Sequence, residues 1–408
     1  MRMQNVDLLI KNANEILTMK GPNKARIKKE MSNLGIVKNA SIAVKDGKIF
    51  DIGKNLKYNS KKTIDAKGKT VLPGFVDPHT HLVFSGTREF ELDWKLKGLS
   101  YLDIKKKGGG ITYTVEKTRK ASEKELYSEA IKRLDNMLSY GTTTCEAKSG
   151  YGLDLKTELK ILKVQKKLNE KHDIDIVSTF LGAHDIPKDL SSAEYTKIVT
   201  EKMLPKVKDY SEFCDVFCEK GFFSNDQSKI ILEAGKKHGL RPKIHADEIV
   251  DTNGASLAAE VGAISAEHLL KTSDKGIKDM AKKGVFAVML PGTPFSLMMK
   301  DYAPARKMID SGVPVALATD LNPNCYVENM QFMIQLACFK MNLTPAEAIT
   351  AATFNAACAI DRNKEIGSLE KGKNADIILL DCKTHLELPY HFGINLVSKV
   401  IKKGKILI

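Results

Sequence analysis

The sequence predicts a (β/α)8 barrel joined to a small β-sandwich domain that both ends of the chain build together. Between residues 69 and 362, eight short apolar runs alternate with amphipathic stretches, as in repeated β-α units around a parallel sheet. Strand-like segments bracket this region on both sides, and 408 residues suffice for a barrel of about 250 residues and a further domain. We therefore expect a composite β domain of residues 1–68 and 363–408 and a barrel of residues 69–362.

Both ends of the chain have the pattern of short strands joined by tight turns. Asp46-Gly47-Lys48 and Lys403-Gly404-Lys405 are typical hairpin turns between apolar, β-branched runs. The predicted strands are residues 7–10, 40–44, 49–52, 375–380, 397–401 and 406–408.

The middle region carries the predicted barrel strands, which are residues 71–81, 142–147, 175–184, 214–219, 242–246, 263–268, 286–290 and 313–319. Clear helices are expected at residues 123–140, 155–171 and 226–238. A doubly wound open sheet is the alternative, but no Gly-x-Gly-x-x-Gly sequence follows the first strand.

The charge of the chain does not indicate a nucleic-acid partner. The formal net charge is +14, but only eight of the 64 basic residues are arginine, and the lysines are spread along the whole chain. Proteins that bind nucleic acids usually gather Arg and Lys on one face, with aromatic residues between them. We therefore expect a small-molecule partner.

Nothing in the sequence indicates a membrane partner. No apolar run approaches the roughly 18 residues of a spanning helix, and the first ten residues lack the apolar core of a signal peptide. The seven cysteines are scattered without a Cys-x-x-Cys pair, which favours buried thiols in a reducing compartment. We expect a cytoplasmic location.

Residues suited to metal binding stand at the ends of several predicted barrel strands. His79 and His81 end the first strand two residues apart, so both imidazoles point the same way. His245 ends the fifth strand, and Asp320 follows the eighth. Because the active sites of (β/α)8 barrels lie at the C-terminal strand ends, we expect these four side chains to converge on one divalent ion with a position left for water.

Further groups are expected to move protons beside the ion. A divalent metal lowers the pKa of bound water toward about 7, so that hydroxide is available for attack. Glu248, three residues beyond His245, is placed to shuttle a proton to a leaving nitrogen, and His268 would orient the hydroxide or stabilise negative charge. Asp320 would take part in catalysis as well. Asp247 is a competing carboxylate that we expect to be structural.

Several segments resemble known hydrolases. Residues 71–81, Val-Leu-Pro-Gly-Phe-Val-Asp-Pro-His-Thr-His, are similar to the amidohydrolase superfamily, as are the β-rich termini and the late Asp320. Five further segments resemble the imidazolonepropionase family within it, and the resemblance covers essentially the whole chain. They are Phe84-Ser-Gly-Thr-Arg88, Gly108-Gly-Gly-Ile111, Lys148-Ser-Gly-Tyr151-Gly, Leu181-Gly-Ala-His184 and His245-Ala-Asp-Glu248.

The resemblance implies an activity, a cofactor and an assembly. Imidazolonepropionases open the cyclic amide of 4-imidazolone-5-propanoate to N-formimidoyl-L-glutamate in histidine degradation, with one zinc or iron ion per site. Imidazole and carboxylate ligands suit both metals. The resemblance also implies a homodimer.

A substrate that bears a carboxylate needs a cationic contact. Arg88 lies seven residues beyond His81 in a loop over the barrel mouth, and a guanidinium can hold a carboxylate through two hydrogen bonds. The alternative is a surface ion pair with Glu89 or Glu91. The resemblance implies further substrate contacts by Tyr151, His184, Glu248 and Asn322, and Tyr101 is an additional candidate.

The chain departs from the family's pattern just after Asp320. The family usually has Asn-Pro-Gly-Thr or Asn-Pro-Gly-Ser there, whereas this sequence has Asn322-Pro323-Asn324-Cys325. Asparagine tolerates a left-handed backbone almost as glycine does, so we expect Asn324 to preserve the loop. Asn324 and Cys325 are candidate substrate contacts, although Cys325 lacks the usual hydroxyl.

Alternative functions share the same scaffold. A deaminase of a cyclic amidine, of the cytosine or guanine type, has the same metal-ligand set and is distinguished by Arg88 together with Tyr151. A non-catalytic scaffold would be expected to lose ligands, and here each ligand is present. Lys220 would suggest two bridged metals if it were carboxylated, but its segment resembles the one-metal branch.

Overall fold

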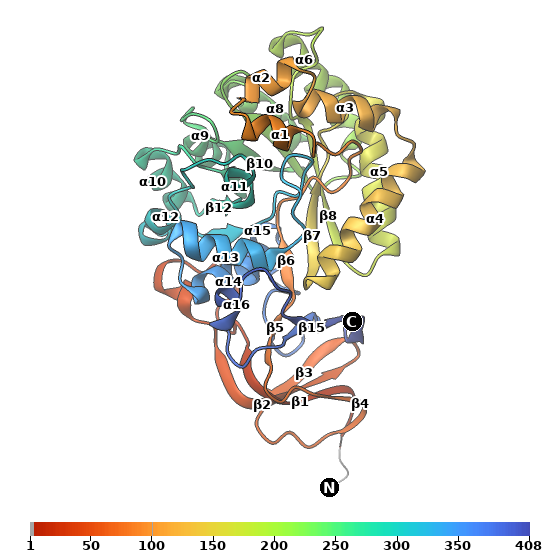
Figure 1. Cartoon of the computed structure of the whole chain (residues 1–408), viewed down its shortest axis with the longest axis vertical. Helices are drawn as coiled ribbons and strands as arrows, with labels where there is room; N and C mark the ends of the chain where they lie inside the picture. The colour runs from red at the N-terminus through yellow and green to blue at the C-terminus, as the bar shows by residue number, and fades with distance from the viewer. Residues whose placement is uncertain (1–3, 100) are drawn as a thin grey trace.

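The structure, a computed structural model, describes residues 4–99 and 101–408 and consists of an eight-stranded parallel barrel and a small β domain (Figure 1). The barrel strands are hydrogen-bonded in chain order from β6 to β13. They are β6 (Phe75–Asp77), β7 (Thr142–Lys148), β8 (Asp175–Ala183), β9 (Phe213–Cys218), β10 (Arg241–Ala246), β11 (Ser265–His268), β12 (Phe286–Met289) and β13 (Val315–Leu317). The predicted fold class is confirmed.

Helices follow the strands and surround the barrel (Figure 1). They are α4 (Glu123–Ser139), α5 (Leu155–Lys171), α6 (Ser192–Ile198), η2 (Val199–Met203), α7 (Leu204–Val207), α8 (Asn225–Lys237), α9 (Gly254–Val261), α10 (Asp274–Lys283), α11 (Gly292–Ser296), α12 (Ala305–Ser311), α13 (Met330–Met341), α14 (Pro345–Ala352) and α15 (Phe354–Ala359). The three helices predicted from the sequence correspond to α4, α5 and α8. A capping box of Ser122 and Glu125 explains where α4 begins.

The small domain is one connected sheet to which both ends of the chain contribute. Its order is β16-β15-β14-β5-β1-β2-β3, and β4 pairs with β1. The strands are β1 (Asn5–Leu17), β2 (Ile36–Lys45), β3 (Lys48–Gly53), β4 (Asn59–Asp65), β5 (Thr70–Pro73), β14 (Ile377–Leu380), β15 (Val397–Lys402) and β16 (Lys405–Ile406), with η1 (Lys28–Ser32) and α16 (Glu387–Tyr390) in the connections. Alternate apolar residues of these strands, such as Leu8, Ile10 and Ile377, form a core of their own.

The predicted first barrel strand is two strands that belong to different domains. The N–H of Gly74 donates to Asp376 of the small domain, whereas the N–H of Phe75 donates to Gly141 of the barrel. A Cβ at Gly74 would lie 2.3 Å from the Thr143 hydroxyl oxygen, so this crossing needs glycine. The terminal sheet therefore reaches Pro73, and the barrel begins at Phe75.

The barrel closes between the segments that follow β6 and β13. The N–H of Asp320 donates to the carbonyl of His79 at 3.1 Å, and the N–H of His81 donates to Leu321 at 2.8 Å. Below them, Asp77 accepts from the N–H and the hydroxyl of Thr319 at 3.1 and 2.6 Å. These hydrogen bonds hold the first and last predicted metal-binding segments against each other.

A long connection between β6 and β7 covers the C-terminal end of the barrel (Figure 1). It contains α1 (Glu91–Leu96), α2 (Tyr101–Lys106) and α3 (Gly110–Lys120). In the described ranges, no helix has the length and apolar character to cross a membrane.

Candidate active site

A cavity of about 480 Å³ lies at the C-terminal ends of the barrel strands, beneath α1. The residues predicted from the sequence that line it are His81, Arg88, Tyr151, His184, His245, Glu248, His268, Asp320, Asn322 and Asn324. His79 is fully buried next to them. The fold thus brings His79 next to Asp320, which lies 241 positions later in the chain.

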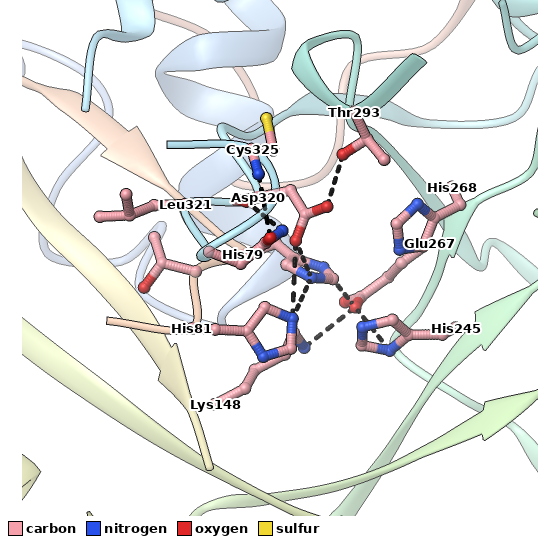
Figure 2. Close-up of polar contacts among 12 residues, drawn as sticks. His79, His81, Lys148, His245, Glu267, His268, Thr293, Asp320, Leu321 and Cys325 are labelled. Carbon is pink, nitrogen blue, oxygen red and sulfur yellow. Dashed lines mark hydrogen bonds and ion pairs between the residues drawn. The ribbon is translucent and has the colours of Figure 1, made fainter. Parts of the chain in front are cut away.

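The four predicted metal ligands converge at the barrel closure (Figure 2). The Nε2 atoms of His79 and His81 are 3.4 Å apart, and Asp320 Oδ1 lies 3.3 and 3.5 Å from them. A ligand nitrogen of His245 lies within 4.8 Å of both. Donors around a tetrahedral ion with bonds of about 2.0–2.1 Å are separated by about 3.3–3.4 Å. The spacing of these donors therefore fits one metal ion.

The hydrogen bonding of the same residues also fits a metal ion. Within the described part of the chain, His245 Nε2 and Asp320 Oδ1 are buried without a hydrogen-bond partner, a rare state for polar atoms. The other oxygen of Asp320 accepts from the Thr293 hydroxyl, which leaves Oδ1 for the ion. Burial lowers the pKa of His79 and His81 well below the usual histidine value, so both present a neutral, metal-binding imidazole.

Two buried carboxylates lie behind the histidine ligands, and Figure 2 shows one of them, Glu267. Glu267 Oε2 lies 2.6 Å from His79 Nδ1, and Asp215 Oδ2 lies 3.0 Å from His245 Nδ1. A carboxylate at Nδ1 favours the tautomer that keeps the Nε2 lone pair for a metal, and it raises the basicity of the ligand. Neither carboxylate is among the residues predicted from the sequence.

These carboxylates belong to a fully buried layer of five charges inside the barrel. Lys148 Nζ contacts Glu146, Asp215 and Glu267 at 2.9–3.0 Å. Lys243 Nζ lies 2.7 Å from Glu146. Burial alone would raise the pKa of Glu267, but the charges of Lys148 and Lys243 lower it to about 2. The layer therefore keeps the carboxylate behind His79 ionised.

The sequence contains a signal for this layer. Glu146 and Lys148 are two residues apart within an apolar strand, and Lys243 precedes His245 by the same interval. Residues i and i+2 of a strand face the same side, so charges at this spacing in a barrel strand point into the interior.

Glu248 and His268, the predicted proton-transfer groups, lie beside each other at the edge of the ligand cluster. His268 Nδ1 is 3.6 Å from Glu248 Oε1, and a ring nitrogen of His268 lies within 4.8 Å of donors of His79 and Asp320. Burial, reinforced by the charge of Asp320, raises the pKa of Glu248 to about 8. Glu248 therefore holds a proton readily.

Backbone contacts fix the position of these two residues. Glu219 Oε2 accepts from the N–H groups of Glu248 and Ile249 at 3.0 and 2.9 Å. Asp247 accepts from the N–H groups of residues 252, 254 and 255, which agrees with the expected structural role. His268 has a φ of +71°, a left-handed conformation that a side chain such as histidine adopts at a cost.

Arg88 is buried in the opposite wall of the cavity. It is 5% exposed, and its Nε lies 3.6 Å from Glu91 Oε1, so its neighbour is a buried carboxylate rather than a surface ion pair. The same oxygen of Glu91 also accepts from the N–H of Gly110 at 2.6 Å. Arg88 Nε and Nη1 have no hydrogen-bond partner among the described residues. The guanidinium therefore retains donors for an anion.

Tyr151 and His184 form an aromatic wall beside the ligands. The His184 ring stacks on His81 with centroids 4.8 Å apart and planes 8° apart, and the Tyr151 ring lies 5.3 Å from His184. His184 Nδ1 is 3.2 Å from the carbonyl of Gly150, so its N–H donates there and Nε2 remains for other contacts. Burial lowers the pKa of His184 to about 3, so the ring is neutral.

In the loop after β13, the backbone of Asn324 does not have the left-handed conformation that we expect from the sequence. Asn322 Oδ1 accepts from the N–H groups of Asn324 and Cys325 at 2.7 and 3.0 Å, and this fixes the loop. Asn324 is not in the left-handed region, so its side chain does not replace a conformational role of glycine. Cys325 is buried with Sγ 3.7 Å from the carbonyl of Thr319, and it is not among the residues that line the cavity. The structure therefore does not bring the Cys325 side chain to the cavity, and its substrate contact stays a prediction.

Two other candidates from the sequence are Lys220 and Tyr101. Lys220 is exposed, so it does not bridge metal ions inside the barrel. Tyr101 begins α2, and its side chain lies outside the described residues.

Removing the carboxylate behind His79 tests the orienting role of the buried layer. We expect Glu267→Gln to weaken metal affinity by about 10–100-fold, because an amide orients and polarises an imidazole less than a carboxylate does. Competition with a chelator of known affinity measures the change. Glu146→Gln is the matched control, since it alters the same charge layer without contact to a ligand. Equal metal affinities of the two variants would contradict the role assigned to Glu267.

Known proteins with similar sequences extend these observations. A model of the amidohydrolase family matches residues 70–407. An imidazolonepropionase of Alkaliphilus metalliredigens is 51% identical over 414 residues, which cover 99% of this chain and 98% of that protein. An imidazolonepropionase of a Geobacillus species is 48% identical, with 98% of each chain covered.

Solved structures with the same fold are more distant in sequence. An adenosine deaminase from Xanthomonas campestris with bound zinc has a TM-score of 0.74 at 17% identity and covers 99% of this chain and 93% of that one. An atrazine chlorohydrolase from Arthrobacter aurescens, complexed with zinc, has a TM-score of 0.72 at 17% identity, with 98% and 95% covered. These likenesses show the fold alone. The family match and the full-length relatives show that the chain belongs to the imidazolonepropionase family of the amidohydrolases.

Proposed function

We propose that the chain hydrolyses 4-imidazolone-5-propanoate and opens its cyclic amide to N-formimidoyl-L-glutamate, a step of histidine degradation. The observation that carries the proposal is the buried Arg88, which faces the same cavity as the ligand cluster and retains donors for an anion. A small cyclic amide with a propionate side chain offers both an electrophilic carbonyl and such an anion. The names of the full-length relatives support the same substrate.

The proposed cofactor is one zinc or iron ion per chain, held by His79, His81, His245 and Asp320. When bound, it supplies the Lewis acidity that activates a water molecule and polarises the amide carbonyl. Three imidazoles and one carboxylate are suitable ligands for either metal.

Glu248 is the proposed proton carrier of the reaction. It takes a proton from the water that attacks the ring carbonyl carbon and delivers it to the ring nitrogen as the amide C–N bond breaks. Its raised pKa suits both steps, because a carboxyl group near neutrality exchanges protons in either direction. The adjacent His268 donates a hydrogen bond that stabilises negative charge on the carbonyl oxygen in the transition state.

The remaining groups bind and orient the substrate. Arg88 pairs with the propionate, and the aromatic wall of Tyr151 and His184 packs against the ring. Asn322 shapes the loop opposite this wall through its hydrogen bonds to residues 324 and 325. Fixing both ends of a small substrate sets the carbonyl carbon in one position for attack.

We also propose that the enzyme works in the cytoplasm. Its seven cysteines are all free, and five of them are buried. Such thiols are typical of a reducing compartment.

Metal removal separates the roles of the ligands and of Glu248. We expect turnover of 4-imidazolone-5-propanoate to be lost on chelation and in His79→Ala, which also loses its metal. Glu248→Gln should retain the metal and lose about 100–10,000-fold in kcat, the range for removal of a proton-transfer group. Elemental analysis and turnover on a panel of cyclic amides and amidines measure both properties. Turnover of a nucleobase without any of 4-imidazolone-5-propanoate would contradict the proposed function.

The carboxylate contact is tested through Arg88. We expect Arg88→Met to raise KM by about 10–100-fold, because a charge-assisted hydrogen bond contributes about 1.5–3 kcal/mol. Metal content should not change, since Arg88 does not contact the ligands. Steady-state kinetics with elemental analysis measures this effect. An unchanged KM would remove Arg88 from the carboxylate site.

A further inference from the structure

Lys95, on α1, brings a second positive charge to the wall of the cavity that contains Arg88. Both residues line the cavity, and Lys95 is half-buried. Its Nζ donates to Asn324 Oδ1 at 2.6 Å. Burial lowers the pKa of Lys95, whereas the charge of Glu91 raises it and that of Arg88 lowers it, so Lys95 lies within electrostatic reach of both residues.

This wall carries more positive than negative charge. Among the described residues, Lys95 has no carboxylate within ion-pair distance, and its hydrogen-bond acceptor is the neutral amide oxygen of Asn324. The carboxylate whose charge acts on Lys95 is that of Glu91, which lies 3.6 Å from Arg88 Nε and also accepts from a backbone N–H. Two cations therefore share one carboxylate. Partly buried charges are costly when unpaired, so the wall is suited to an incoming anion.

Asn324 explains why the lysine side chain is held at the cavity. Its own N–H donates to Asn322 Oδ1 at 2.7 Å, so the acceptor for Lys95 is fixed to the loop after β13. The side chain of Asn324 thus connects this loop to α1 at the cavity.

We propose that Lys95, oriented by Asn324, is a specificity-determining residue that forms the second cationic contact for the carboxylate of the substrate. The proposal rests on the proposed function and deepens it. Arg88 and Lys95 bind the two oxygens of one carboxylate from different sides, so the site selects small cyclic amides that bear an anionic side chain. Neutral cyclic amides of the same size lose both contacts.

Equilibrium binding of two inert ligands tests this proposal without turnover. One is a five-membered cyclic urea that carries a propionate, and the other is the same ring with a propionamide. We expect the metal-loaded wild-type protein to prefer the propionate. Lys95→Gln, which keeps a group that can hydrogen-bond to Asn324, should weaken propionate binding about tenfold and leave propionamide binding unchanged.

Two further variants separate the effect of the positive charge at position 95 from the effect of the hydrogen bond between Lys95 and Asn324. Lys95→Arg retains the charge and should bind the propionate within about threefold of the wild type, because the cation is conserved. Asn324→Gly retains the lysine but removes its acceptor, and should weaken propionate binding less than Lys95→Gln does. Metal content, measured on each variant, should equal that of the wild type.

The outcomes distinguish this proposal from the proposed function. Equal weakening of both ligands in Lys95→Gln would make Lys95 a structural contact of α1 and would overturn the proposal, as would unchanged binding of both. A wild-type protein that does not prefer the propionate would overturn it as well. If the preference and its loss in Lys95→Gln are observed but 4-imidazolone-5-propanoate is not hydrolysed, the proposed function fails while the anion specificity of Lys95 stands.

Discussion

The hydrogen bonds that close the barrel between the ends of β6 and β13 also assemble its metal site. The backbone of Asp320 pairs with that of His79, and His81 pairs with Leu321, so three of the four proposed ligands come from one closure. Asp77 secures this contact from below through Thr319. The remaining ligand, His245, arrives from β10, on the far side of the barrel order. Any change that opened the closure would separate the ligands.

The buried charge layer determines the tautomers of two of the histidines at the barrel closure. Glu267 and Asp215 fix the tautomers of His79 and His245, while Lys148 keeps both carboxylates ionised. Buried ion pairs of this kind do little for stability because their desolvation offsets their attraction. Their value here lies in orienting ligands. The opposite wall carries the reverse charge, because Arg88 and Lys95 outnumber Glu91 there. This excess of positive charge is the basis of the proposed contact with an anionic substrate group.

Much of this arrangement could be predicted from the sequence because strands and their ends leave local signals. Apolar runs followed by His, Glu or Asp predicted the eight strands and the residues at their C-terminal ends. The division of the first run at Gly74 was missed, because the change of hydrogen-bond partner leaves the apolar pattern intact. Lys95 was missed because its contact to Asn324 joins segments 229 residues apart. A pattern of neighbouring residues in the sequence does not indicate such a contact.

The most direct test of this account is X-ray absorption spectroscopy of the metal-loaded protein, combined with elemental analysis of the same sample. We expect one ion per chain, with scattering from three imidazole nitrogens and one carboxylate oxygen at about 2.0–2.2 Å. Two ions per chain, or sulfur among the ligands, would contradict the convergence of His79, His81, His245 and Asp320 on a single metal.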